Sequence, residues 1–342
     1  MEKKRKCVPE LFRGVNVPTF EDLRSLILRR FPEPITLPKS VKKRGMVKEL
    51  VRIERIYSIV DDRLAKLVES LPQPGDLGQF YRELLSISGI SNYEEALERL
   101  KVMRRIIRNL YLRYKARIKA SFDAAESRKL SREFVGRVIS VLRRNRWVLD
   151  GLREASKTIA GMPCIREDEP TVVEAGTPQV GKSSLVRALS TAKPEVSPFP
   201  FTTKTIILGH VYIDDYLRIQ LIDTPGILDR PIDELNPIER KALAALKHLP
   251  DAVLFVVEPR KGSYYSLEKQ VRLLRSVRKL IGGRAPFVIA INKVDISRPE
   301  EVARAEDEVK KACPSCPVLK VSALTGEGLE DLLNVLRRLL GL

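Results

Sequence analysis

Apolar residues in the first half of the chain recur at helical spacing. Between residues 53 and 67, and again between 97 and 118, an apolar side chain returns every three or four positions, which is the period of an amphipathic α-helix. A third segment, about 131–160, repeats the pattern, and a shorter helix is expected near 20–30. Three or more such helices with short connections predict a bundle. The rest of the first 45 residues, which are rich in proline, are expected to form an extended arm.

Beyond about residue 165 the pattern changes to short, β-branched apolar runs that alternate with helix-length segments. This alternation predicts βαβ units and a mostly parallel sheet. We expect six strands, in "TVVEAG", "TIILGHVYI", "LRIQLID", "DAVLFVVEP", "PFVIAIN" and "PVLKVSA". A short Asp-Asp turn joins the second and third runs, so they predict a hairpin with one antiparallel strand at the sheet edge. The sequence thus predicts a multidomain protein, with an all-α helical bundle at 1–165 and an α/β domain at 166–342.

Charge is distributed as unevenly as the apolar pattern. The chain carries a net charge of +18, and residues 1–165 hold +16 of it, against +2 for residues 166–342. Between Lys101 and Arg146 there are fifteen basic and three acidic residues. A positive excess without acidic partners favours a polyanion such as RNA, recognised through phosphates and shape. A charged but merely solvated helix face is the alternative interpretation.

Aromatic residues accompany this basic segment. Tyr111, Tyr114 and Trp147 have rings that could stack on nucleobases. The first two also fall on or beside the apolar stripe of their helix, and packing in the core is the interpretation that we favour for all three.

Composition excludes several other classes of protein. Apolar residues make up 44% and charged residues 31% of the 342 residues, without an apolar run of the roughly 18 residues that a membrane helix needs. No apolar segment follows the charged N-terminus, so we expect a cytoplasmic protein that does not contact a membrane. The four cysteines predict no disulfide framework. Cys313 and Cys316 have only half of a zinc-site spacing, and we favour two thiols or an incidental disulfide in a loop.

One glycine-rich segment carries the clearest chemistry. After "TVVEA" the sequence matches G-x-x-x-x-G-K-S and then turns helical, which is the context of a phosphate-binding P-loop. Its glycines let backbone N–H groups surround phosphate oxygens, and the helix N-terminus favours the same charge. Lys182 is expected to reach the β- and γ-phosphates, and Ser183 to ligate Mg²⁺. The expected phosphate-binding residues are Gly176, Thr177, Pro178, Gln179, Val180, Gly181, Lys182, Ser183 and Ser184.

A second motif indicates which base is bound. Asn292-Lys293-Val294-Asp295 follows an apolar strand, where the Asp295 carboxylate can accept hydrogen bonds from N1–H and the exocyclic amine of guanine. Adenine lacks this donor pair, so the motif favours GTP over ATP. Lys293 is expected to lie along the purine face, and Asn292 to brace the loop. The residues that fit a loop contacting the guanine oxygen through its backbone are Ser322, Ala323 and Leu324.

The γ-phosphate side of the site is expected in two further segments. In "SPFPFTTKT" we favour Thr203, with Thr202 as the alternative, as the hydroxyl that joins Mg²⁺ when the γ-phosphate is present. In "DTPGIL" Asp223 is expected to hold the Mg²⁺ shell, and the Gly226 N–H to contact the γ-phosphate. Ile227 stands where a water-positioning side chain is usual, so we expect slow intrinsic hydrolysis. The candidate catalytic groups are Lys182, Thr203 and Gly226, and the candidate metal ligands are Ser183, Thr203 and Asp223.

Taken together, these motifs resemble the Obg-like P-loop GTPases. "PFTTK", "GH" at 209–210, "DTPGILDR" and "SSLVRAL" look like the nucleolar G-protein (NOG) branch, and "LPKSVKKRGMVKELVRIERI" and "YEEALERLKVMRRIIRNL" extend the resemblance into the basic half. The resemblance implies a GTPase that acts in assembly of the large ribosomal subunit. Its helical domain is expected to bind precursor ribosomal RNA, with other assembly proteins as further partners. The chain ends just after its last expected helix, which is similar to a short archaeal form.

Two residues depart from the pattern of this class. Gln179 stands where many such GTPases have an asparagine that helps to hold K⁺, so K⁺ activation is not implied for this chain. Glu174 interrupts the apolar run of the first strand, where we expect a polar edge. Two other functions stay open on the residues alone: a GTPase that serves tRNA or RNA modification, and a scaffold that binds GTP and RNA without hydrolysis.

Overall fold

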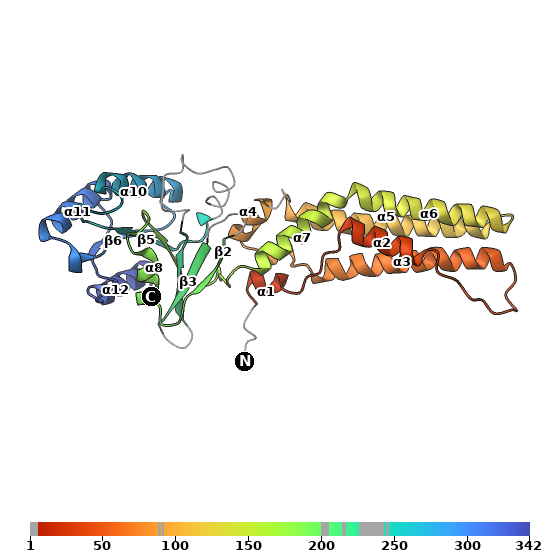
Figure 1. Ribbon diagram of the computed structural model, residues 1–342, viewed down its shortest axis with the longest axis horizontal. Helices are drawn as coiled ribbons and strands as arrows, with labels where there is room; N and C mark the ends of the chain where they lie inside the picture. Colours follow the sequence, from red (N-terminus) through yellow and green to blue (C-terminus); the bar gives the residue numbers. More distant parts are fainter. Residues whose placement is uncertain are drawn as a thin grey trace. The chain divides into compact units, whose positions relative to one another are not determined.

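The computed structural model describes residues 6–87, 90, 92–199, 205–213, 217–225, 243 and 246–342. The chain divides into two compact units, coloured along the sequence in Figure 1. The helical unit comprises Leu11–Asp76 and Ser88–Ala160, and the α/β unit comprises Met1–Glu10, Leu77–Ile87 and Gly161–Leu342. Packing therefore draws two segments of the first half into the α/β unit, whereas the sequence indicates one boundary at residue 165. No helix among these residues combines the length and the apolarity needed to cross a membrane.

The helical unit is built from long amphipathic helices. They are α2 (Phe20–Arg30), α3 (Arg44–Ser70), α5 (Tyr93–Lys119), α6 (Ala124–Arg144) and α7 (Arg146–Ala160), with a 3₁₀ turn, η1, at Pro74–Asp76. The predicted stripe between residues 53 and 67 is at most 2% exposed and packs towards α5 and α6. Figure 1 shows α3, α5 and α6 running side by side. The predicted bundle is confirmed.

Two details of the first half of the chain differ from the expectation. The segment predicted as one helix at about 131–160 is two, α6 and α7, because the chain breaks at Asn145. The Asn145 side chain donates to the Val141 carbonyl at 2.8 Å and so caps the end of α6. The expected N-terminal arm also holds a second short helix, α1 (Val8–Phe12), in addition to α2.

The α/β unit contains a seven-stranded sheet in the order β2-β3-β4-β1-β5-β6-β7. Its strands are β1 (Thr171–Ala175), β2 (Glu195–Pro198), β3 (Thr205–Tyr212), β4 (Arg218–Asp223), β5 (Ala252–Val257), β6 (Phe287–Ile291) and β7 (Val318–Lys320). β3 pairs antiparallel with β2 and with β4. The other pairings, β4 with β1, β1 with β5, β5 with β6 and β6 with β7, are parallel. The mostly parallel sheet and the β3–β4 hairpin are confirmed, while its Asp-Asp turn lies outside the described residues.

The strand count and the edge differ from the prediction of six strands. β2 is the additional strand, and it places β3 one position in from the edge. Its sequence, Glu-Val-Ser-Pro, is short and largely exposed, so it lacks the apolar run by which the other strands are found. An edge strand needs only one hydrogen-bonded neighbour and can be polar.

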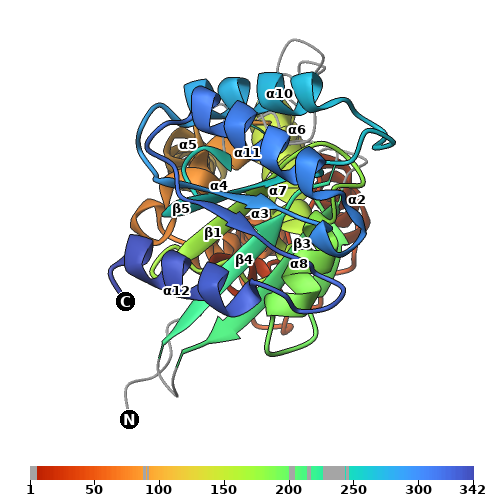
Figure 2. The same ribbon diagram turned by 90° about the vertical axis from the view of Figure 1, so that its left-hand side faces the viewer.

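Helices cover both faces of this sheet. They are α8 (Lys182–Leu189), α10 (Leu267–Ile281), α11 (Pro299–Ala312) and α12 (Leu329–Leu340). The unit also contains α4 (Gln79–Ile87). Figure 2 shows α10 and α11 on one face and α8 and α12 on the other. Leu185 and Leu336, from α8 and α12, share one buried cluster with strand residues such as Val172 and Leu254. β1 and β5 are buried along their whole length, as central strands of a covered parallel sheet should be.

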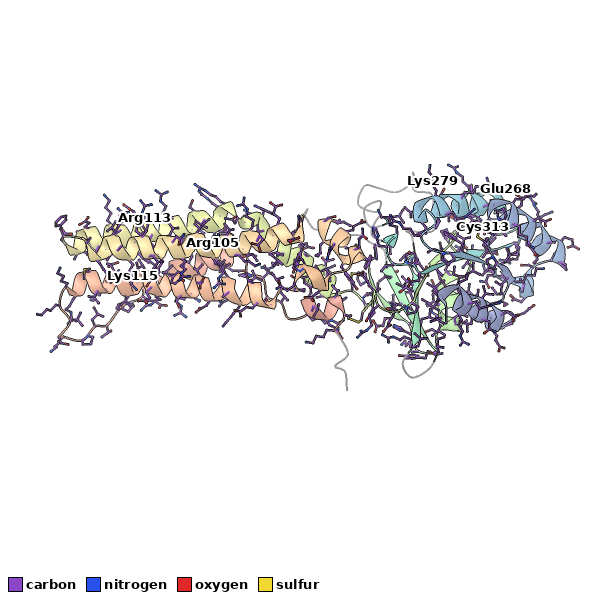
Figure 3. The ribbon with its side chains drawn as sticks, turned by 180° about the vertical axis from the view of Figure 1, so that it is seen from behind. Arg105, Arg113, Lys115, Glu268, Lys279 and Cys313 are labelled. Carbon is purple, nitrogen blue, oxygen red and sulfur yellow. A yellow bond between two sulfur atoms is a disulfide. The ribbon has the colours of Figure 1, made fainter. Side chains whose placement is uncertain are left out.

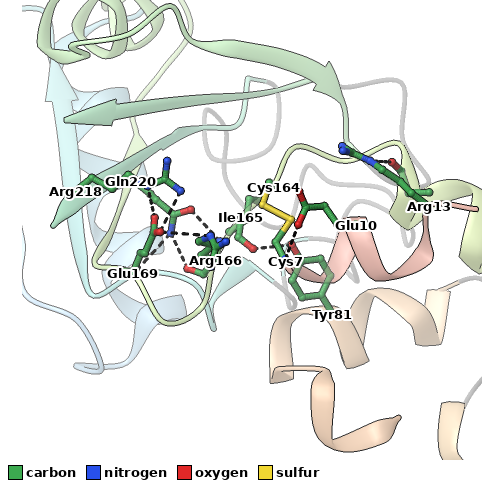
Figure 4. Close-up of a disulfide and its surroundings, with 11 residues drawn as sticks. Cys7, Glu10, Arg13, Tyr81, Cys164, Ile165, Arg166, Glu169, Arg218 and Gln220 are labelled. Atoms are coloured by element: carbon green, nitrogen blue, oxygen red, sulfur yellow. Dashed lines mark hydrogen bonds and ion pairs between the residues drawn. A yellow bond between two sulfur atoms is a disulfide. The ribbon is translucent and has the colours of Figure 1, made fainter. Parts of the chain in front are cut away.

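The Cys7–Cys164 disulfide corrects another prediction, whereas a Cys313–Cys316 disulfide is one of the two forms that we expected for that pair. Cys7 pairs with Cys164, and Cys313 pairs with Cys316, so no cysteine within the described residues is free. Figure 4 shows the first disulfide beside Tyr81 of α4, whose hydroxyl donates to the Ile165 carbonyl at 3.0 Å. Cys7 and Cys164 are separated by 157 residues, and their pairing depends on tertiary packing that cysteine spacing does not reveal.

Candidate nucleotide site and basic surface

The parallel strands of the sheet end at one common edge, where ligands bind in open α/β folds. β4 ends at Asp223, and the segments that follow β1, β5 and β6 start at Gly176, Glu258 and Asn292. In register, Glu174 of β1 faces Asp223 of β4 and Leu254 of β5. The sheet therefore gathers motifs that are far apart in the sequence.

The P-loop has backbone conformations that depend on glycine. Gly176 has φ +147° and Gly181 has φ +99°. A Cβ on Gly176 would lie 2.4 Å from the Val256 carbonyl oxygen, and one on Gly181 would lie 2.2 Å from Asn292 Nδ2. Gln179 is left-handed too, with φ +67°, although it is not glycine. The loop is thus fitted closely against β5 and the Asn292 side chain.

Lys182 opens α8 and is 6% exposed. Its ammonium donates to the Gly176 carbonyl at 2.8 Å and the Thr177 carbonyl at 3.0 Å. An ammonium has three protons, so a third can be donated to a phosphate oxygen. No side chain caps the N-terminus of α8 at Gly181, which leaves its first N–H groups suited to an anion.

Ser183 and Asp223 provide oxygen atoms at the same position. The Ser183 hydroxyl donates to Asp223 Oδ2 at 2.6 Å, and Asp223 is fully buried. A hydroxyl beside a carboxylate is the hard-oxygen donor set that Mg²⁺ prefers, so these residues fit that ion. The other predicted residues of this side of the site, Thr203 and Gly226, lie outside the described residues, as do Thr202 and Ile227.

Glu174 has a role different from the polar edge that we expected. β1 lies between β4 and β5 in the middle of the sheet, and the Glu174 side chain is fully buried. Burial, followed by the negative charge of Asp223, raises the pKa of the Glu174 carboxyl well above its usual range, and Lys182 offsets part of this shift. A protonated Glu174 beneath the phosphate site is therefore favoured in the folded protein.

Asn292 connects three loops around the expected base site. Its Nδ2 donates to the Val180 carbonyl at 2.9 Å, and its Oδ1 accepts from the Ala323 N–H at 3.0 Å. Its own N–H donates to the Val257 carbonyl at 2.8 Å. Asn292 is 1% exposed, so these bonds brace the P-loop, the β5 end and the 322–324 loop against one another.

Lys293 is fixed by a residue that sequence reasoning missed. Its ammonium donates to the Gln179 carbonyl at 2.7 Å and to Glu258 Oε2 at 2.7 Å. Glu258 is 3% exposed and also pairs with Arg260. Its backbone is held in turn by the Gln270 side chain, which accepts from the Glu258 N–H and donates to its carbonyl. The signal that could have found Glu258 is an acidic residue directly after the apolar run "AVLFVV".

Asp295 and the 322–324 loop complete the expected base site. Asp295 lies exposed in the 3₁₀ turn η3 (Val294–Ile296). Ser322 is buried and its hydroxyl accepts from the Thr325 N–H at 3.1 Å, whereas the Leu324 side chain is 87% exposed. This loop can therefore offer a base its backbone groups, while the Leu324 side chain points to solvent.

The helical unit has cations on its surface that are left without carboxylate partners. On α5, Arg104 is bonded to Asp61 at 3.0 and 3.1 Å. Within the described part of the chain no carboxylate pairs with the exposed Arg105 and Arg113; Figure 3 shows them along α5 with Lys115. Core packing, which we favoured for all three aromatic residues, holds for Tyr111 and Tyr114, which are 6% and 5% exposed. It is wrong for Trp147, which is 43% exposed.

Comparisons with known proteins cover both units. Residues 14–166 match the model of the NOG1 N-terminal helical domain, and residues 171–293 match that of a 50S ribosome-binding GTPase. Uncharacterized protein MJ1408 of Methanocaldococcus jannaschii is 36% identical, over 78% of this chain and 73% of its own length. Nucleolar GTP-binding protein 1 is 31% identical in Caenorhabditis elegans, over 92% of this chain, and 34% identical in Drosophila melanogaster, over 70%. The matches span 47% and 37% of those two relatives, less than half of each.

Proposed function

The chain belongs to the nucleolar GTP-binding protein (NOG) family, and we propose that it hydrolyses GTP during assembly of the large ribosomal subunit in the cytoplasm. The helical unit would bind ribosomal RNA of the precursor particle, where other assembly proteins would be further partners. The GTPase domain would time the release of the protein from the particle. The observation that carries this proposal is a braced nucleotide site in the same chain as a basic helical surface.

The phosphates of GTP would lie on the P-loop. Lys182 and the N-terminal N–H groups of α8 would bind the β- and γ-phosphates, because Lys182 presents protons from a buried position and no side chain caps the start of the helix. Mg²⁺, held by Ser183, Asp223 and Thr203, would neutralise charge on the β- and γ-phosphates. The guanine would lie at Asp295, with Lys293 along its face.

Hydrolysis is attack by water on the γ-phosphate, which yields GDP and inorganic phosphate. Lys182 would stabilise the negative charge that develops on the transferred group. Because Ile227 replaces a water-positioning side chain, the intrinsic rate would be slow, with the missing group supplied elsewhere in the chain or by the ribosomal partner. Thr203 and Gly226 would be ordered by the γ-phosphate and released after hydrolysis, which is the timing step.

The experiment is GTP turnover by the full chain with and without precursor large-subunit particles. We expect slow turnover alone and faster turnover with the particles. No turnover in either condition would instead favour a GTP-binding RNA scaffold.

Co-sedimentation tests the RNA part of the proposal. We expect the chain to sediment with large-subunit particles in a salt-dependent manner, because phosphate contacts release counterions. Binding to tRNA without binding to these particles would refute the assembly role and support action on tRNA.

A further inference from the structure

Phe122 stands in the turn between α5 and α6 and is 98% exposed. Burying a phenylalanine ring stabilises a fold. A fully exposed ring therefore contributes nothing to the stability of this unit. The adjacent residues, Ser121 and Asp123, are polar. The ring is therefore free to meet a partner.

The turn that carries Phe122 is held by hydrogen bonds. The Ser121 hydroxyl contacts the Ile118 carbonyl at 2.7 Å and the Ser127 hydroxyl at 2.6 Å. Asp123 accepts from the Glu126 N–H at 2.7 Å, and Glu126 accepts from the Phe122 N–H at 2.9 Å. The ring is thus presented by an ordered turn, which lowers the entropic cost of binding.

Several lysines lie on the helix ends next to this turn, which itself carries the carboxylates of Asp123 and Glu126. α3 begins beside α6, because a Cβ on Gly45 would lie 2.6 Å from the Ala124 Cβ, and Figure 1 shows both helices starting at the end of the unit where α5 stops. Four exposed lysines lie near the turn: two just before α3, one at the end of α5 and one early in α6. None of them has a carboxylate partner among the residues that the structure describes. With Phe122 they form what we call the basic tip: Lys42, Lys43, Lys119, Phe122 and Lys129.

We propose that Phe122 stacks on an unpaired base of an RNA whose phosphates are bound by the lysines of the basic tip. A flat ring among cations fits single-stranded RNA, which offers a base face and phosphates together. A groove on a protein would instead favour further apolar side chains around the ring. Here the flanking residues, Ser121 and Asp123, are polar, and the exposed residues on the adjoining helix ends include the lysines of the basic tip. This inference rests on the proposed RNA binding of the helical unit and adds the kind of RNA, an unpaired loop.

The test measures binding of the full chain to two RNA probes of equal phosphate count, a hairpin with an unpaired loop and a fully paired duplex. Phe122→Ala should weaken hairpin binding about 5- to 150-fold, the range for one stacked base, and leave duplex binding unchanged. Phe122→Trp should retain hairpin binding, since an indole also stacks. Leu28→Ala, which removes an exposed apolar side chain (49% exposed) from α2 of the same unit, is the matched control and should change neither.

Replacing Lys42 and Lys43 by glutamine should weaken binding of the hairpin and the duplex equally, because these residues would contact phosphates only. The salt dependence of binding should also decrease. Unchanged hairpin binding by Phe122→Ala would refute the stacking role while leaving RNA binding intact. If the unaltered chain bound neither the probes nor large-subunit particles, the proposed function itself would fail. A photo-crosslinker at position 122 adds a direct readout in those particles: crosslinks to RNA support the proposal, and crosslinks to protein alone contradict it.

Discussion

The candidate nucleotide site and the basic surface of the helical unit differ in whether their charged side chains have partners within the chain. At the nucleotide site, Lys182 is bonded to carbonyls, Lys293 to Glu258, and Ser183 to Asp223. On α5, by contrast, no carboxylate of the described residues neutralises Arg105 or Arg113. The chain itself fixes the first set, whereas the second set has no carboxylate partner among the described residues and is available to a polyanion. Substitutions in the first set should therefore change chemistry or nucleotide affinity, and those in the second should change RNA affinity and its salt dependence.

The largest effect should come from Lys182→Ala. This change removes the buried ammonium that we propose binds the phosphates, so GTP turnover should fall by at least about 100-fold, the range for one charge-stabilising donor. Binding of the RNA probes by the helical unit should be unchanged. Turnover is measured as phosphate release at saturating GTP.

Lys261→Ala is the control for this change, because Lys261 is an exposed lysine of the same unit outside the P-loop. Its turnover should equal that of the unaltered chain. If Lys182→Ala kept full activity, the P-loop would not be the catalytic site.

The second effect concerns the base. Asp295→Asn replaces the proposed acceptor of two guanine protons by an amide, so GTP affinity should fall by about 100-fold, or about 3 kcal/mol. Xanthosine triphosphate, which offers an oxygen where guanine has its amine, should bind the variant better than GTP does. Competition against a fluorescent nucleotide measures both affinities. An equal loss for both nucleotides would mean that Asp295 does not read the base.

Sequence alone predicted those parts of the molecule in which a local pattern carries the information. The α3 stripe and the buried β5 strand were predictable, because burial repeats with the period of the element. β2 and the helix break at Asn145 were not, because a polar edge strand and a side-chain cap leave no apolar period.

The candidate site divides in the same way. Glycine and N-K-x-D spacings are local, so the P-loop and Asn292 could be identified as a motif. Glu258 acts through Lys293, which lies 35 residues away, and Phe122 is distinguished only by its exposure. The Cys7–Cys164 disulfide was also missed, because its pairing depends on contact between residues that are 157 positions apart in the sequence.

The third prediction tests the unpaired cations. Replacing Arg105 and Arg113 by glutamine should lower RNA affinity by about tenfold and reduce the slope of log affinity against log salt by about 0.9 for each lost phosphate contact. GTP turnover without particles should be unchanged. Arg146→Gln is the matched control, because Arg146 already pairs with Asp150 at 3.0 Å, and its effect should be smaller. An equal effect of the paired and unpaired arginines would break the comparison between the two regions.

The fourth prediction concerns Glu258, which positions Lys293. Glu258→Gln keeps the shape of the side chain but leaves two cations, Lys293 and Arg260, without their buried counter-charge. Affinity for GTP and GDP should fall about 3- to 10-fold, equivalent to about 1 kcal/mol, with turnover at saturating GTP unchanged. Glu268→Gln breaks an exposed pair with Arg304 and should leave affinity unchanged. A loss of stability without a loss of nucleotide affinity would assign Glu258 to folding alone.

The smallest effect is a pH dependence of stability at Glu174. The Glu174 carboxyl has a raised pKa in the folded protein, so it keeps its proton at pH values where the unfolded chain has lost it. The free energy of unfolding therefore falls as pH rises above the unfolded pKa of about 4.3. Glu174→Gln lacks this loss, so its stability relative to the unaltered chain should increase with pH, measured by urea unfolding without nucleotide or Mg²⁺. Glu300→Gln, at an exposed position of α11, controls for removing a carboxyl, and a pH-independent difference at Glu174 would contradict the role of burial and Asp223 in holding its proton.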